Sequence, residues 1–125
     1  MSISDQHFSA PLLVVCLCAE WCGVCRDYRS RFDQVKAAIE TAQPQATFLW
    51  IDVENEADLL DPVDVDDFPT LLIALGATPH FFGPLTPQAQ MLERMVHTTQ
   101  QAPDGDGLAD ATLRALVKRI RAAQR

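Results

Sequence analysis

Leu12-Leu-Val-Val-Cys-Leu-Cys-Ala-Glu-Trp-Cys-Gly-Val-Cys25 is the stretch that decides the fold of this chain. Its first half, Leu12 to Cys18, is a continuous apolar run after Pro11, which predicts a buried parallel strand. From Gly23 the apolar residues recur at helical spacing, and Pro44 lies just beyond the predicted helix end. The two cysteines Cys22 and Cys25 therefore lie where a strand turns into a helix.

The rest of the chain predicts a mixed sheet flanked by helices. Strands are predicted at Thr47–Val53, Thr70–Leu75 and Pro79–Phe82, and helices at about 56–60, 87–99 and 108–123. A strand–helix–strand unit is right-handed and makes its two strands parallel, whereas the hairpin over 70–82 adds antiparallel strands. We therefore expect an α/β fold with a four-stranded mixed sheet.

Length and charge limit the classes of protein that need to be considered. With 125 residues the chain fits one domain, 1–125, with a core at about 12–100, a linker at 101–107 and an additional C-terminal helix. The formal net charge of -7 argues against binding to nucleic acids or to acidic membrane surfaces. The first residues show no export signal, and the four cysteines are crowded between Cys16 and Cys25, so we expect a cytoplasmic protein.

The Cys-x-x-Cys motif at a helix start suits disulfide exchange. Unpaired N–H groups and the positive end of the helix dipole stabilise a thiolate on the first cysteine, Cys22, which makes it the candidate nucleophile. Cys25 lies almost one turn later, so its sulfur can close a disulfide with Cys22 and release a bound partner. The alternative is a zinc site, which needs further ligands, and none of the three histidines forms a second ligand pair.

The residues Ala19-Glu20-Trp21-Cys22-Gly23-Val24-Cys25, followed later by Phe68-Pro69-Thr70, resemble the two hallmark motifs of the thioredoxin family. The resemblance covers about 12–99 and implies a thioredoxin-like fold whose four strands lie in the order 2-1-3-4. It also implies no cofactor and a cis-proline at Pro69 that faces the dithiol. It also implies catalytic residues Cys22 and Cys25. The implied substrate-binding residues are Trp21, Gly23, Val24, Phe68 and Pro69.

The chain departs from the family pattern at several positions. Cys16 stands where the family has a buried acid, Trp50 where it has a strand lysine, and Val24 where it has the middle proline of the motif. Without the acid, release of the mixed disulfide is expected to be slower. Cys16 and Cys18 share one strand face, where they are poorly placed to bond each other, and we interpret both as core residues.

The two ends of the chain also differ from a full thioredoxin, and these differences change which helices cover the sheet. We expect the strand and helix that open a full thioredoxin to be absent before Leu12, and the helix from Leu108 to be an addition. We expect this added helix to cover the sheet face that the missing helix leaves bare; the alternative is that a partner or a second subunit covers it.

The sequence thus predicts a thiol–disulfide oxidoreductase whose partners are protein disulfide substrates. Its electron donor would be a thioredoxin-reductase-like protein or glutathione, with no nucleic acid or membrane among its partners. Two alternatives stay open: a thioredoxin-fold binding or assembly module with little turnover, and a metal-binding protein.

Overall fold

The computed structural model describes residues 11–19, 21–84, 89–101 and 107–123. Its elements in chain order are β1 (Leu12–Cys18), α2 (Gly23–Ala42), β2 (Thr47–Asp52), α3 (Ala57–Leu60), β3 (Thr70–Leu75), β4 (Thr78–Pro84), α4 (Ala89–Gln100) and α5 (Ala111–Ala123). The predicted strands and helices are all present, with bounds that differ by a few residues. The predicted start of α4 at Pro87 and most of the predicted linker lie outside the described residues.

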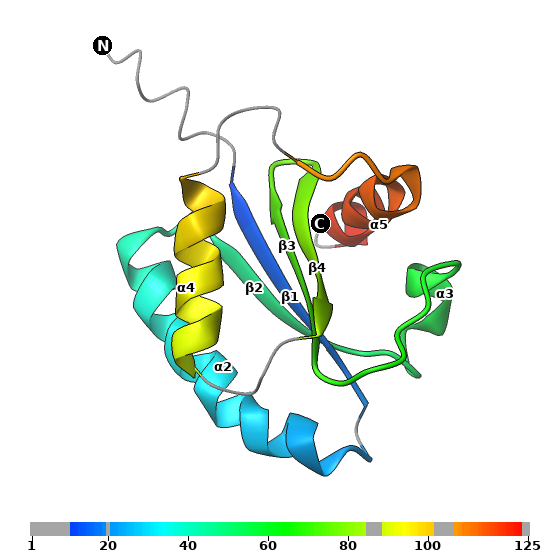
Figure 1. Ribbon diagram of the computed structural model, residues 1–125, viewed down its shortest axis with the longest axis horizontal. Coiled ribbons are helices and arrows are strands. Elements are labelled where there is room, and N and C mark those ends of the chain that lie inside the picture. Colours follow the sequence, from blue (N-terminus) through cyan, green and yellow to red (C-terminus); the bar gives the residue numbers. More distant parts are fainter. Residues whose placement is uncertain (1–10, 20, 85–88, 102–106, 124–125) are drawn as a thin grey trace.

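The four strands form one mixed sheet in the order β2-β1-β3-β4, which confirms the prediction (Figure 1). Strand β1 pairs in parallel with β2 and antiparallel with β3, and β3 pairs antiparallel with β4. Every residue of β1 is buried, because the strand is central and both of its faces are covered. The dithiol therefore follows, in the chain, directly after a strand that is buried along its whole length.

Helices cover both faces of the sheet (Figure 1). Successive side chains of β1 alternate between two core clusters, with Cys16 and Cys18 in one and Leu17 in the other. The first cluster packs under α2 and α4, whereas the second packs under α5 and the segment around α3. The added helix α5 thus covers a sheet face, as predicted.

Helix α5 begins at Ala111, three residues later than the predicted start at Leu108. Asp110 sets this start, because its Oδ1 accepts hydrogen bonds from the backbone N–H groups of Thr112 (2.8 Å) and Leu113 (3.1 Å). These are two of the N–H groups that a helix leaves without a partner in its first turn, and an aspartate at this place satisfies them.

Two arginines fasten α5 to segments far away in the sequence. Arg119 donates from Nε to the carbonyl oxygen of Leu59 (2.8 Å) and from Nη2 to that of Asp61 (3.0 Å). Arg121 donates from Nη2 to the carbonyl oxygen of Pro11 (2.9 Å) and from Nε to that of Gly76 (2.5 Å). Partial burial lowers the pKa of Arg121 below its ordinary value.

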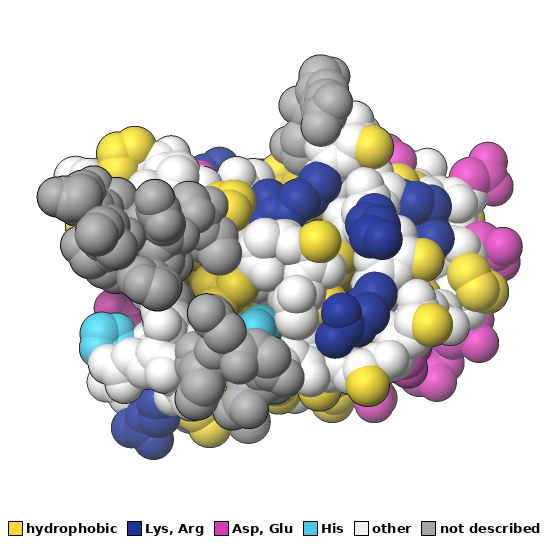
Figure 2. Space-filling view, turned by 90° about the horizontal axis from the view of Figure 1, so that it is seen from above, with side chains coloured by type: hydrophobic (Ala, Val, Ile, Leu, Met, Phe, Trp, Pro, Cys, Tyr) yellow, Lys and Arg dark blue, Asp and Glu magenta, His cyan; other side chains and the backbone are white. Residues whose placement is uncertain are grey.

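Lysine and arginine side chains gather over α5, while aspartate and glutamate side chains lie along the neighbouring edge of the molecule (Figure 2). On the face shown, the basic side chains are therefore grouped apart from the acidic ones. Within the described segments, no helix combines the length and apolar character needed to cross a membrane.

Candidate active site

Cys22 occupies the N-cap position of α2, in the turn that follows β1. Its backbone is extended (φ -84°, ψ 119°), and its N–H donates to the carbonyl oxygen of Ala19 (3.0 Å). The Cys22 carbonyl oxygen in turn accepts the N–H of Arg26 (3.2 Å), which closes the first turn of the helix. The side chain makes no capping bond of its own and is partly exposed, so its sulfur is open to a partner.

The two thiols of the motif differ in acidity. The pKa of Cys22 is lowered from its ordinary value of 9.0, first by the backbone N–H of Cys25 and then by the Cys25 side chain, the Val24 N–H and the charge of Arg26. Cys25 is only 1% exposed, and this burial, followed by its contact with the Cys18 thiol, raises its pKa. The arrangement therefore favours a thiolate on Cys22 and a protonated thiol on Cys25.

Iodoacetamide added to the reduced protein at neutral pH is expected to modify Cys22 before the other three cysteines. A lowered pKa leaves more thiolate at every pH below 9.0, so the rate at Cys22 should level off at a lower pH than that of an unstructured cysteine peptide. Peptide mass spectrometry over a time course measures this order. Earlier modification of Cys25 or Cys16 would contradict the assignment of the nucleophile.

An apolar rim surrounds Cys22. Trp21 is 62% exposed and Val24 45% exposed, and the Trp21 ring packs edge-on against Phe68 with centroids 5.6 Å apart. Trp21 is also held by a hydrogen bond from its Nε1 to Oε2 of Glu54 (3.0 Å). Exposed aromatic and branched side chains beside a reactive sulfur form a surface on which a partner's apolar side chains can pack.

The predicted substrate residues have different degrees of exposure. The Phe68–Pro69 bond is cis, as the resemblance implies, with Phe68 half-buried and Pro69 buried just before β3. Gly23 is exposed, and a Cβ placed on it would meet no atom within 4 Å. The exposed part of the predicted surface therefore consists of Trp21, Gly23 and Val24.

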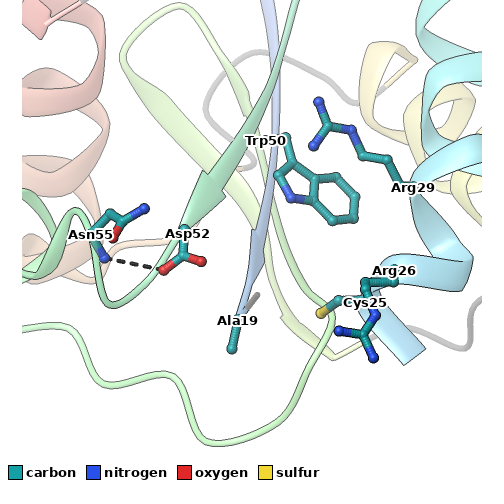
Figure 3. A pocket seen from close by; sticks show the side chains of 7 residues that line it. All are labelled: Ala19, Cys25, Arg26, Arg29, Trp50, Asp52 and Asn55. Atoms are coloured by element: carbon teal, nitrogen blue, oxygen red, sulfur yellow. Dashed lines mark hydrogen bonds between the residues drawn. The ribbon is translucent and has the colours of Figure 1, made fainter. Parts of the chain in front are cut away.

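A pocket of about 330 Å³ lies beside Cys25 (Figure 3). It is lined by Ala19, Cys25, Arg26, Arg29, Trp50, Asp52 and Asn55. Trp50 is the register partner of Cys16, so a thiol and an indole occupy the adjacent positions where the family has an acid and a lysine. The Arg29 guanidinium lies 4.7 Å from the centre of the Trp50 ring, a cation–π contact that holds both side chains in the pocket wall.

Asp52 brings a carboxylate to the same pocket as Cys25, and the two side chains enter it from different elements (Figure 3). Its Oδ1 accepts hydrogen bonds from the N–H groups of Glu54 (2.8 Å) and Asn55 (3.1 Å), which fix the carboxylate at the end of β2. The sequence analysis did not single out Asp52 as a residue of the site. The signal was available, because the carboxyl ends of adjacent parallel strands meet at one edge of a sheet.

Cys16 and Cys18 are buried on one face of β1, as predicted, and all four cysteines are free thiols. Their sulfur atoms lie closer than expected, with 3.2 Å between the two Sγ atoms, which is hydrogen-bonding contact rather than a covalent bond. Cys18 also shares a side-chain hydrogen bond with Cys25. Within the described ranges, no three His, Cys, Asp or Glu side chains form a group that could hold a metal ion.

A comparison with protein-family models matches residues 3–96 to the family described as Thioredoxin. The chain belongs to the thioredoxin family. Among curated proteins, it is 30% identical over 67 residues to "Endoplasmic reticulum resident protein 44.2" of Caenorhabditis elegans. That alignment covers 52% of this chain but 16% of the relative, so the chain corresponds to a small part of that protein.

Solved structures of thioredoxin-fold proteins share the same architecture. The zinc-bound form of human ERp44 superposes with a TM-score of 0.65 at 17% identity, over 81% of this chain and 30% of that chain. The thioredoxin Deadhead of Drosophila melanogaster gives a TM-score of 0.59 at 22% identity, over 76% and 87% of the two chains. Chloroplastic thioredoxin z gives 0.59 at 21% identity, over 82% and 93%. At these identities the likeness shows the fold alone.

Proposed function

We propose that this protein is a thiol–disulfide oxidoreductase that acts on protein disulfides through Cys22 and Cys25. The observation that carries the proposal is the contrast between the two thiols: Cys22 is partly exposed with a lowered pKa, and Cys25 is buried with a raised one. Membership of the thioredoxin family supports the same chemistry.

The proposed reaction has two exchange steps. The Cys22 thiolate attacks one sulfur of the substrate disulfide, forming a mixed disulfide and releasing the other substrate sulfur as a thiolate. Cys25 then attacks the Cys22 sulfur, which forms the Cys22–Cys25 disulfide and releases the second substrate thiol. The substrate gains two electrons and the protein loses two. A thioredoxin-reductase-like protein or glutathione would then return the protein to its dithiol form.

The second step needs a proton acceptor for Cys25, since burial keeps this thiol protonated. Asp52 is the carboxylate that lines the pocket beside Cys25, and we assign it this role, through water in the pocket. It would replace the family's buried acid, whose position Cys16 occupies.

The rim of the site indicates the kind of substrate segment that would bind. Trp21 and Val24 offer apolar surface, while Glu54, Asp66 and Asp67 are exposed acidic residues from neighbouring segments of the chain. Such a rim favours extended segments with apolar and basic side chains over acidic ones. The four free thiols suit a reducing compartment, and we include the cytoplasm in the proposal.

Trapping of substrates tests this function. The Cys25→Ser variant is expected to accumulate mixed disulfides with oxidised protein substrates, because Cys22 still attacks but the resolving thiol is gone. Non-reducing gels and mass spectrometry measure the adducts. The matched Cys22→Ser variant should trap nothing, and equal trapping by both variants would overturn the assignment.

The alternative is a thioredoxin-fold binding module with little turnover. It is favoured by one observation, the replacement of the family's acid and lysine by Cys16 and Trp50. Trapping by neither variant, together with reversible binding of a partner, would support this alternative.

A further inference from the structure

Four sulfur atoms form a continuous path from the surface into the core. Cys22 contacts Cys25, Cys25 shares a hydrogen bond with Cys18, and the Cys18 sulfur lies 3.2 Å from that of Cys16. The last three side chains are at most 1% exposed and belong to a single core cluster, against which Cys22 packs. The proposed function uses only the first two thiols, so the inner two have no assigned role.

We propose that Cys18 is a second resolving thiol. It attacks the Cys25 sulfur of the Cys22–Cys25 disulfide, so that the disulfide then joins Cys18 and Cys25 inside the core. The proposal rests on the proposed function, because exchange with a substrate at Cys22 supplies the first disulfide.

The transfer is a balanced thiol–disulfide exchange. The Cys18 sulfur attacks the Cys25 sulfur, the Cys18–Cys25 bond forms, and the Cys22–Cys25 bond breaks with both of its electrons going to Cys22. Cys18 gives up its proton, which ends on solvent water. One thiol and one disulfide give one disulfide and one thiolate, so no further oxidant or reductant is required.

Two features of the site favour this direction of transfer. A thiol of low pKa is the better leaving group, and the pKa of Cys22 is lowered by the backbone N–H groups at the start of α2. The new disulfide would lie wholly within the apolar cluster, where a neutral disulfide is better accommodated than thiols that lose hydrogen bonds to water.

Cys25 is a better partner for Cys18 than Cys16 is. Residues two apart on a strand have Cα atoms about 6.4–6.8 Å apart, at the upper end of the range that a disulfide spans. Cys18 and Cys25 instead come from different elements, the end of β1 and the first turns of α2. Cys16 contacts the Cys18 thiol but takes no part in the exchange.

The shifted disulfide would change what the site can do. Cys22 is again a free, partly exposed thiol, but Cys25 is no longer available to resolve a mixed disulfide. A second substrate attacked by Cys22 would therefore stay attached. The protein would reduce one disulfide and then retain the next partner covalently.

Peptide mapping of the full chain tests the shift directly. The reduced protein is treated with one equivalent of dithiodipyridine, alkylated with N-ethylmaleimide after increasing times, and cleaved with a glutamate-specific protease without reduction. Cleavage after Glu20 and Glu40 places Cys16 and Cys18 in peptide 1–20, and Cys22 and Cys25 in peptide 21–40. We expect an early disulfide within 21–40, replaced later by a disulfide that joins the two peptides, with the alkyl group on Cys22.

Variants of equally buried cysteines on the same strand face serve as a matched pair. Cys18→Ala should lose the joined peptides, whereas Cys16→Ala should retain them. Cys22→Ser should form no joined peptides, because the exposed thiol that attacks the disulfide of the reagent is then absent.

The time course distinguishes a failure of the proposed disulfide shift from a failure of the proposed function. If the Cys22–Cys25 disulfide forms but the two peptides never join, the shift to Cys18 is wrong and the proposed function stands. If Cys22 remains a mixed disulfide with the reagent, both are wrong. Joined peptides in the Cys22→Ser variant would overturn the route through Cys22. The measurement on the unaltered chain decides the question even if Cys18→Ala fails to fold.

Discussion

The Asp52→Asn variant is expected to resolve mixed disulfides roughly 10²-fold more slowly than the natural protein, because general-base assistance is worth about that much when it is well placed. The amide keeps an oxygen that can accept the hydrogen bonds of the Glu54 and Asn55 N–H groups, so the turn after β2 should persist. It cannot accept the proton of Cys25. Stopped-flow measurement of the second exchange step, with a fluorescent disulfide substrate, gives this rate.

Two further variants separate proton transfer from a general disturbance of the site. The Asn55→Asp variant alters the same pocket wall but leaves Asp52 in place, so its second step should remain close to the natural rate. The Cys16→Asp substitution restores an acid at the family's position and should recover part of the rate when combined with Asp52→Asn. An Asp52→Asn protein that resolves mixed disulfides at the natural rate across pH 6 to 9 would exclude Asp52 as the proton acceptor.

The Leu116→Ala variant is expected to lose about 2–5 kcal/mol of unfolding free energy, the usual range for truncating a fully buried leucine. Leu116 is 0% exposed and belongs to the cluster under α5, together with Leu13 and Leu72 of the sheet. Truncation leaves a cavity between helix and sheet, because α5 is fastened through its arginines and cannot settle freely into the space. Urea denaturation followed by circular dichroism measures the loss.

Lys118→Ala is the matched control for Leu116→Ala, since this lysine is exposed on the same helix. Its unfolding free energy should stay within about 0.5 kcal/mol of the natural value. A loss below about 1 kcal/mol for Leu116→Ala would show that α5 contributes little to covering the sheet. The rate of the first exchange step, in which Cys22 attacks the substrate disulfide, should be unchanged in both variants under conditions where the protein is folded.

Local patterns were sufficient to predict the elements of the fold. The run Leu12 to Cys18 is apolar on both strand faces. This pattern is typical of a central strand that is covered on both faces, and β1 is such a strand. The helical spacing after Gly23 predicted α2, whereas the order of the four strands followed from the resemblance to the thioredoxin family. The start of α5 was predicted too early because Asp110 was not recognised as the capping residue.

The dithiol could be located from sequence, but the arrangement behind it could not. Which side chains line the pocket depends on the packing of β2 beside β1 and of α2 over both, which brings Asp52 and Arg29 to one cavity. The 3.2 Å approach of the Cys16 and Cys18 sulfurs depends on side-chain rotamers, which strand spacing does not determine. The spacing of Cys16 and Cys18 predicted that they share a strand face, but it did not predict that their sulfur atoms touch.

The attachments of α5 have a consequence for the order in which the protein can assemble during synthesis. Arg119 and Arg121 bind carbonyl groups at Leu59, Asp61, Gly76 and Pro11, all made well before the helix itself. One face of the sheet, including Leu13, Val15 and Leu72, therefore lacks the part of its cover that α5 provides until this helix has emerged from the ribosome. A nascent chain with all four strands but no α5 would expose an apolar surface, which makes it a natural client for chaperones at that stage.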